Sequence, residues 1–300
     1  MRMQRLAGCA ALALLAASAA TAQTKKLKIY ISADMEGIGG ISTWDVQAAP
    51  GAPQYEQARR LMTEEVNAAI AGAYDAGATE VLVSDSHANG QNIDVELLDK
   101  RARLIRAFPR PQGMAQGVDA TFDAALFIGY HASEGTPEAI LAHTDSHRRI
   151  FEIKLNGTPV PEAGFYGAVA GEYGVPVVFL SGDQAAGEEA KQLFGPIETV
   201  AVKQAYGFYS GMMMSPEESR RLIRAGVKRG IERRGELKPY KMTHPVKLEV
   251  TFKQEIMAEL ISFLPGIERP RGHTIVFTAR DMLEAARFLN AVLDLNTYPD

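Results

Sequence analysis

The chain has 300 residues, of which 46% are hydrophobic and 23% charged, and it carries a formal net charge of −4. This composition is typical of a globular protein and excludes the basic surface expected of a nucleic-acid-binding protein. Cys9 is the single cysteine, so no disulfide bond within the chain can stabilise the fold. The length indicates one large domain or two modest ones.

The N-terminus has the features of an export signal peptide. Two arginines precede an apolar run over residues 6–20, and an Ala-Thr-Ala cleavage motif ends at Ala22. The run is shorter than the roughly 20 apolar residues of a membrane-spanning helix. We therefore expect residues 1–22 to be removed and the mature protein to be periplasmic or secreted, without membrane attachment. A lipid anchor at Cys9 is the alternative, but the hydrophobic stretch follows this cysteine instead of preceding it.

Strand and helix patterns then alternate, which predicts an α/β sheet covered by helices. An Asn-Gly pair at 156–157 also predicts a β-hairpin between two of the strands. The predicted strands cover Leu27–Ala33, Glu80–Ser84, Ala124–Gly129, Arg149–Leu155, Thr158–Val160 and Val175–Leu180, and the predicted helices cover Pro53–Gly77, Glu162–Tyr173 and Gln184–Leu193.

Near residue 200 the pattern changes to a block with few candidate catalytic side chains. Its predicted elements are helix Pro216–Arg234, strand Val246–Phe252, a short helix, strand Thr274–Thr278 and helix Asp281–Leu295. We therefore predict an α/β fold with helices on both faces of a mostly parallel sheet. The signal peptide covers 1–22, the domain with the candidate site covers 24–199, and a smaller C-terminal α/β domain covers 200–300.

Three of the predicted strands end in polar residues that can bind metal. The first strand is followed by Asp34 and Glu36, the second by Asp85 and His87, and the third by His131. Because ligand sites of parallel α/β sheets form beyond the carboxyl ends of the strands, we expect these side chains to converge. Carboxylates and imidazoles are common ligands of divalent transition metals, zinc above all. The sequence therefore predicts a metal site at this edge, in which cations neutralise the carboxylates.

The spacing of Asp34 and Glu36 favours more than one metal ion. Residues i and i+2 of a strand project from the same face, about 6.6 Å apart along the backbone. Paired metals in two-metal hydrolases lie roughly 3.5–4 Å apart, so one carboxylate can bridge two ions while the other binds one of them. Gly37, Gly39 and Gly40 follow and allow the backbone to turn closely around the site.

Other residues of this region fit the same site. His143 and His147 lie on the segment before the hairpin, Glu162 starts the helix after it, and Asp85 is a candidate for orienting a ligand imidazole. Each residue also has a purely structural interpretation: a strand-end Asp can cap a turn, a loop histidine can face solvent, and Glu162 can interact with the helix dipole. Four of the six histidines lie between His87 and His147, which favours the metal site.

Several stretches of the sequence resemble the dizinc D-aminopeptidases of the DppA type. They extend over nearly the whole mature chain, and the order and spacing of D-M-E-G, S-D-S-H and G-Y-H is a specific combination. The stretches are "IYISADMEGIGG", "YEQARRLMTEEVNAAI", "EVLVSDSHAN", "ALFIGYHAS", "GTPVPEAGFYGAVAGEYGVPVVFLSGD" and "FTARDMLEA". The resemblance implies a two-domain α/β subunit in a ring-like homo-oligomer, which is a decamer in the family.

The resemblance also implies two Zn²⁺ ions per subunit, held by five residues. These are Asp34, Glu36, His87, His131 and Glu162. Asp34 would bridge the two ions, with Glu36 and His131 completing one site and His87 and Glu162 completing the other. The catalytic histidine of the family corresponds to His143. The loop before it is one residue longer than the family pattern, so His147 is the rival for this role.

Together these residues predict a zinc-dependent aminopeptidase that hydrolyses the N-terminal residue of short peptides by metal-activated water. The resemblance favours D-amino-acid peptides. The alternatives are an L-specific aminopeptidase, another dinuclear metal amidohydrolase and, as a non-enzyme, a periplasmic binding protein. A dinuclear phosphoesterase is disfavoured because the sequence has no G-K-[ST] phosphate-binding loop.

Overall fold

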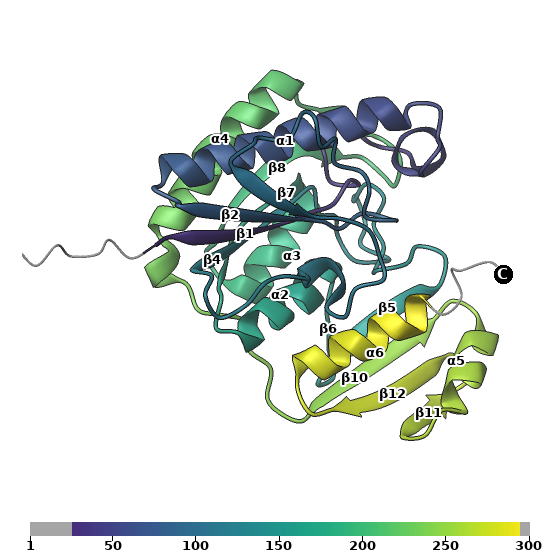
Figure 1. Ribbon diagram of the computed structural model, residues 1–300. Coiled ribbons are helices and arrows are strands. Elements are labelled where there is room, and N and C mark those ends of the chain that lie inside the picture. Colours follow the sequence, from purple (N-terminus) through teal and green to yellow (C-terminus); the bar gives the residue numbers. More distant parts are fainter. Residues whose placement is uncertain (1–25, 295–300) are drawn as a thin grey trace, which may run out of the picture.

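The computed structural model describes residues 26–294, which form two β-sheets and the helices that cover them (Figure 1). The larger sheet has the strand order β3-β2-β1-β4-β7-β8-β9 and is parallel except for β9, which runs antiparallel to β8. Its strands are β1 (Lys28–Ala33), β2 (Glu80–Asp85), β3 (Ala102–Ile105), β4 (Ala124–Ile128), β7 (Val177–Asp183), β8 (Glu198–Ala205) and β9 (Gly211–Met213).

Helices cover both faces of this sheet. In Figure 1, α1 (Tyr55–Asp75) and α4 (Pro216–Glu232) lie above it, while α2 (Glu162–Glu172) and α3 (Gln184–Phe194) lie below it. The central strands β1, β4 and β7 are almost entirely buried because apolar side chains pack against helices on either side. The predicted fold class, with helices on both faces of a mostly parallel sheet, is confirmed.

The smaller sheet has the order β11-β12-β10-β5-β6 and is antiparallel. Its elements are β5 (Ile150–Leu155), β6 (Thr158–Pro159), β10 (Val246–Phe252), α5 (Glu255–Ser262), β11 (Ile267–Arg271), β12 (Thr274–Ala279) and α6 (Met282–Asp294). The predicted hairpin is confirmed: β5 pairs with β6, and its turn residues Asn156 and Gly157 have φ angles of 49° and 85°. The hairpin, which precedes residue 199, pairs with β10 of the later block, while β8 and β9 belong to the larger sheet. The domain boundary itself stays a prediction.

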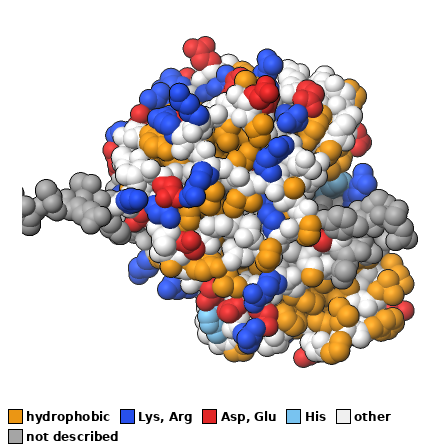
Figure 2. Space-filling model, in the orientation of Figure 1, with side chains coloured by type: hydrophobic (Ala, Val, Ile, Leu, Met, Phe, Trp, Pro, Cys, Tyr) orange, Lys and Arg blue, Asp and Glu red, His pale blue; other side chains and the backbone are white. Residues whose placement is uncertain are grey.

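Apolar side chains gather at the lower right of the molecular surface in Figure 2, on the side where Figure 1 places α5. Ile256, Leu260, Phe263 and Leu264 of this region are 46–71% exposed. No helix among residues 26–294 has the length and apolar character needed to cross a membrane. The predicted signal peptide lies outside the described residues.

Candidate metal centre

The three strands that end in polar residues are neighbours in the sheet. β1 lies between β2 and β4, and Ala33 at its end is in register with Asp85 on one side and Ile128 on the other. The residues that follow these strands therefore meet at the carboxyl edge of the sheet, as predicted. Asp34, Glu36, His87 and His131 are each at most 3% exposed there.

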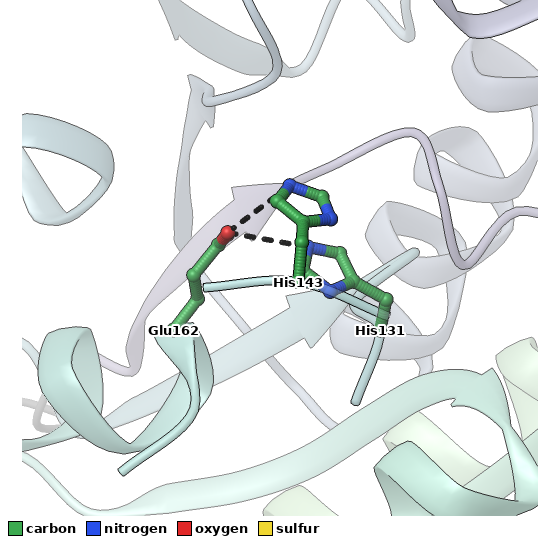
Figure 3. A group of neighbouring side chains, drawn as sticks. All are labelled: His131, His143 and Glu162. Carbon is green, nitrogen blue, oxygen red and sulfur yellow. Dashed lines mark ion pairs between the residues drawn. The ribbon is translucent and has the colours of Figure 1, made fainter. Parts of the chain in front are cut away.

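Glu162 reaches the same place from the first residue of α2 (Figure 3). Its Oε1 lies 3.3 Å from Nε2 of His131 and 3.4 Å from Nε2 of His143. The rings of the two histidines are stacked, with centroids 3.9 Å apart. The helix start thus directs a carboxylate at two imidazoles that come from segments before the hairpin.

Asp34 connects the two halves of the cluster. Its Oδ1 lies 3.2 Å from Nδ1 of His87, and its Oδ2 lies 3.4 Å from Nε2 of His131. Glu36 Oε2 is 2.8 Å from the same nitrogen of His87. The donor atoms of Asp34, Glu36 and His131 also lie within 4.8 Å of one another, as do those of His131, His143 and Glu162. The central place of Asp34 suits a bridging ligand.

The contacts in the structure pair His87 with Glu36 and His131 with Glu162. The family resemblance instead groups Glu36 with His131, and His87 with Glu162. The donor atoms of Asp34, Glu36 and His131 lie close together, which is compatible with the grouping of Glu36 with His131. How the ligands are divided between two ions therefore stays a prediction.

Backbone carbonyl groups fix the orientation of all three imidazoles. His87 Nε2 donates to the carbonyl of Ala48 (2.8 Å), His131 Nδ1 to that of Ala132 (2.9 Å), and His143 Nδ1 to that of Leu141 (2.7 Å). Since a carbonyl can only accept, each of these nitrogens carries the proton, and the other ring nitrogen faces the carboxylates. This is the arrangement that orients ligand histidines in metal sites.

The donor set fits a metal ion such as zinc. Asp34 Oδ2 and His131 Nε2 are buried and lack a hydrogen-bond partner among the described residues, although they face each other across 3.4 Å. Buried polar atoms without partners are costly, and a cation between these two atoms would satisfy both. Three buried carboxylates around three imidazoles form a nitrogen and oxygen ligand set of the kind that zinc prefers.

The electrostatics of the cluster also favour positive charge. Burial disfavours protonated His131, but the carboxylates of Glu162 and Asp34 outweigh burial and raise the pKa of His131 to about 10. Burial and the nearby Glu36 raise the pKa of Asp34. Burial, together with His131, lowers the pKa of His143 to about 4, so His143 is neutral at pH 7. The carboxylates thus attract cations while His143 keeps a free nitrogen lone pair.

A close backbone approach explains one of the glycines after Glu36. The amide of Gly37 donates to the carbonyl of Gly129 over 2.7 Å. A Cβ atom at position 37 would lie 2.0 Å from the carbonyl oxygen of Tyr130, closer than any real contact. Only glycine therefore lets the loop that carries Glu36 touch the loop that carries His131.

Asp85 does not orient an imidazole, contrary to the prediction. Its carboxylate accepts hydrogen bonds from the backbone amides of Asn92 and Ile93 and from the side chain of Asn92. Asn92 in turn donates to the carbonyl of His87. Asp85 therefore stabilises the loop after His87. Backbone carbonyls orient the imidazoles instead, and a sequence pattern does not reveal where these carbonyls lie.

Most of the cluster lines a cavity of about 490 Å³, to which the loops at the carboxyl edge of the larger sheet, the segment before β5, α2 and α6 contribute. Trp44 forms part of one wall, and its ring lies 4.2 Å from that of His147 and 5.5 Å from that of His87. Asn290 and Leu293 of α6 form part of another wall. Sequence patterns did not indicate these α6 residues, because the late block carries no motif that points to the site.

His147 is half-buried and lies further out than His143. Its ring contacts Trp44 and the edge of His143, and its Nε2 accepts a hydrogen bond from Nε of Arg148. His143 Nε2, in contrast, lies 3.4 Å from Glu162 and 4.0 Å from Glu36. The geometry favours His143 for a role at the metal cluster.

Known proteins share both the sequence and the fold. The model of the D-aminopeptidase family of peptidases matches residues 27–291. A D-aminopeptidase of Bacillus subtilis (strain 168) is 38% identical over 273 residues, which is 90% of this chain and 97% of that protein. The solved structure of the Zn-dependent D-aminopeptidase DppA from Bacillus subtilis, described as a self-compartmentalizing protease, has a TM-score of 0.86 and 36% identity over 91% of this chain and 100% of that one. The chain belongs to the D-aminopeptidase family.

Proposed function

We propose that the protein is a zinc-dependent aminopeptidase that removes the N-terminal residue of short peptides, with a preference for D-amino acids. The observation that carries this proposal is the buried cluster of carboxylates and imidazoles at the floor of a cavity, in a chain of the D-aminopeptidase family. Similarity to a solved Zn-dependent D-aminopeptidase supports both the metal and the stereochemistry.

Two zinc ions per subunit would be held by Asp34, Glu36, His87, His131 and Glu162. When bound, zinc supplies Lewis acidity to the scissile carbonyl and lowers the pKa of water toward 7. Asp34 would bridge the two ions, and the contacts of its two oxygens with different histidines support this role. Glu162 and Glu36, which belong to the same cluster, would help to neutralise the charge of the ions.

His143 would move the proton. Its Nδ1–H is held by the carbonyl of Leu141, so Nε2 is the nitrogen that accepts a proton during attack and returns it to the leaving amine. Nε2 lies beside Glu162 at the edge of the cavity, where a bound peptide bond would be. Walls formed by loops, α2 and α6 would enclose the substrate, which favours short peptides.

The decisive experiment measures metal content and hydrolysis together. We expect purified protein to contain two zinc ions per subunit and to hydrolyse D-Ala-D-Ala faster than L-Ala-L-Ala. N-acetyl-D-Ala-D-Ala should resist hydrolysis, and a chelator should abolish activity, which zinc then restores. Activity that is unchanged after complete metal removal would contradict the proposal, and binding of peptides without hydrolysis would support the periplasmic binding protein instead.

We also propose that the protein is a homo-oligomer, a decamer by family resemblance. The exposed apolar side chains at α5, and those of Tyr206, Phe208 and Tyr209 (46–63% exposed), support this proposal because monomers rarely expose large apolar patches. Light scattering after gel filtration should give a mass near ten subunits, and a monomer mass would contradict it.

The proposed export rests on residues 1–22. Expression of the full chain in a Gram-negative host should place the mature protein in the periplasm, with Gln23 as its first residue by mass spectrometry. Retention in the cytoplasm with residues 1–22 still attached would contradict the proposal.

A further inference from the structure

Asp145 places a carboxyl group beside the metal cluster that the proposed mechanism does not use. It follows His143 by two residues, and its backbone amide donates to Oε1 of Glu162 over 2.6 Å. Its φ angle is 60°, a left-handed conformation that Asp adopts more readily than most residues. The bond to Glu162 fixes the backbone of Asp145 directly behind a metal-ligand carboxylate.

A buried tyrosine fixes the side chain as well. Tyr166, which lies one helical turn after Glu162 on α2 and is 1% exposed, donates its hydroxyl hydrogen to Oδ2 of Asp145 over 3.1 Å. Asp145 and Tyr166 both line the cavity that contains the metal cluster. Tyr166 therefore holds the carboxyl group of Asp145 at the cavity wall through Oδ2, and among residues 26–294 no hydrogen bond to the second oxygen, Oδ1, is formed.

Among residues 26–294, no Lys, Arg or His side chain forms an ion pair with Asp145, whose two hydrogen bonds are those to Glu162 and Tyr166. Asp145 is also absent from the groups of donor atoms close enough to share a metal ion. The side chain of Asp145 lies in a partly enclosed cavity beside Glu162, and a cation from elsewhere would stabilise its ionised form. The substrate of an aminopeptidase supplies such a cation.

We propose that Asp145 binds an ammonium group of the substrate; this inference rests on the proposed function. The α-nitrogen of a peptide lies about 2.5 Å from the carbonyl carbon of the same residue. A scissile carbonyl beside Glu162 and His143 thus brings the α-ammonium next to Asp145. The ammonium of a lysine-like N-terminal side chain has the same chemistry and is the other possible source.

Asp145→Asn is the test variant. Asn keeps an acceptor for Tyr166, keeps the backbone amide, and tolerates a positive φ angle, so the fold should be retained. A charge-assisted hydrogen bond to ammonium is worth enough to change affinity by about 30-fold. We expect kcat/KM for D-Ala-D-Ala to fall by about that factor, with unchanged zinc content and unchanged melting temperature. Asp119→Asn, at an exposed position, is the matched control and should behave as wild type.

Calorimetry separates binding from turnover. The probes are a phosphinate isostere of D-Ala-D-Ala and the same compound without its amino group. The wild-type protein should prefer the amine by about 30-fold, and Asp145→Asn should reduce this preference to less than about threefold. An equal loss of affinity for both compounds would overturn the proposal, because it indicates a structural role. Loss of zinc in the variant would also overturn it, because Asp145 would then be a metal ligand.

Kinetics with a second substrate, D-Lys-D-Ala, identify which ammonium group Asp145 binds. If Asp145→Asn weakens D-Ala-D-Ala and D-Lys-D-Ala equally, Asp145 binds the α-ammonium. If it weakens only D-Lys-D-Ala, Asp145 binds the side-chain ammonium. An unchanged kcat/KM for both substrates overturns the inference. If the proposed function is wrong, the wild-type protein will hydrolyse neither peptide. The calorimetric comparison would still decide whether Asp145 binds an ammonium group.

Discussion

Lys203 on β8 is buried and donates through Nζ to the backbone carbonyl of Glu36. The same ammonium donates to the carbonyls of Ile38 (3.0 Å) and Ile41 (2.6 Å). One cation thus holds three carbonyl groups of the loop that carries a predicted metal ligand. Lys203 positions Glu36 through the backbone, without touching its carboxylate.

Lys203→Met should therefore weaken both the fold and the metal site. The change leaves three buried carbonyls without their donor, and each such loss costs about 1–3 kcal/mol. We expect the free energy of unfolding in chelator to fall by about 3 kcal/mol or more, measured with urea. Zinc affinity, measured by competition with a chromogenic chelator, should fall by about tenfold or more because the loop is less well fixed. Lys191→Met, at an exposed position on α3, is the control, and an unchanged zinc affinity in Lys203→Met would refute the positioning role.

The roles of His143 and His147 can be separated by kcat and zinc content. His143→Ala removes an imidazole whose Nε2 lies 3.4 Å from Oε1 of Glu162, and it should reduce kcat by about 100-fold or more while two zinc ions remain bound. His147→Ala removes a ring that packs on Trp44 and should change kcat by less than about fivefold. Zinc loss in His143→Ala would show that it is a ligand. A large fall of kcat in His147→Ala alone would assign catalysis to His147.

Asp34 should affect both metal positions. Because its two oxygens face His87 and His131 separately, Asp34→Ala should reduce zinc from two ions to less than one and abolish peptide hydrolysis. Glu36→Ala and Glu162→Ala should each retain about one ion, since each lies at one side of the cluster. Mass spectrometry of metal content gives the count. Two ions retained in Asp34→Ala would exclude a bridging role.

The sequence predicted those features that depend on local pattern. Strands β1, β2 and β4 are largely apolar and are followed by Asp34, His87 and His131, so the meeting of these side chains followed from the rule for parallel sheets. Strand β3 was missed because it is short and lies at the sheet edge, where its side chains are only partly buried and the apolar alternation is weak.

Other features depend on contacts between distant segments. The carbonyl of Ala48 orients His87 from 39 residues away, and Asn290 of α6 lines the cavity. The role of Ala48 cannot be predicted from its residue type, because a backbone carbonyl is present at every position. The place of Asn290 at the cavity depends on tertiary packing of α6, which the sequence pattern does not show. The pairing of β5 with β10 is likewise set by tertiary packing of two segments about 100 residues apart in sequence, so the local sequence pattern did not indicate it.

A second buried ionisable side chain, that of Glu65, makes the stability of the fold depend on pH. Glu65 on α1 is 2% exposed, and its Oε1 accepts hydrogen bonds from the amide of Gly39 (3.1 Å) and the hydroxyl of Ser219 (3.0 Å). Burial outweighs these bonds and raises the pKa of Glu65 from 4.5 to about 7. Between these two values the folded chain holds a proton that the unfolded chain releases. The contribution of Glu65 to stability is therefore present below pH 4.5 and is lost as the pH rises through 7.

Glu65→Gln should remove this dependence, since glutamine stays neutral at every pH. A shift of this size corresponds to a loss on the order of 3 kcal/mol in the wild type between pH 4 and pH 8. The free energy of unfolding of Glu65→Gln, measured in chelator so that zinc does not contribute, should therefore rise relative to wild type by about that amount over the range. Glu56→Gln, whose side chain is 80% exposed, should keep a constant difference from wild type. If the Glu65→Gln difference were also constant with pH, the pKa of Glu65 would be the same in the folded and unfolded states, and its two hydrogen bonds would then balance the cost of burial.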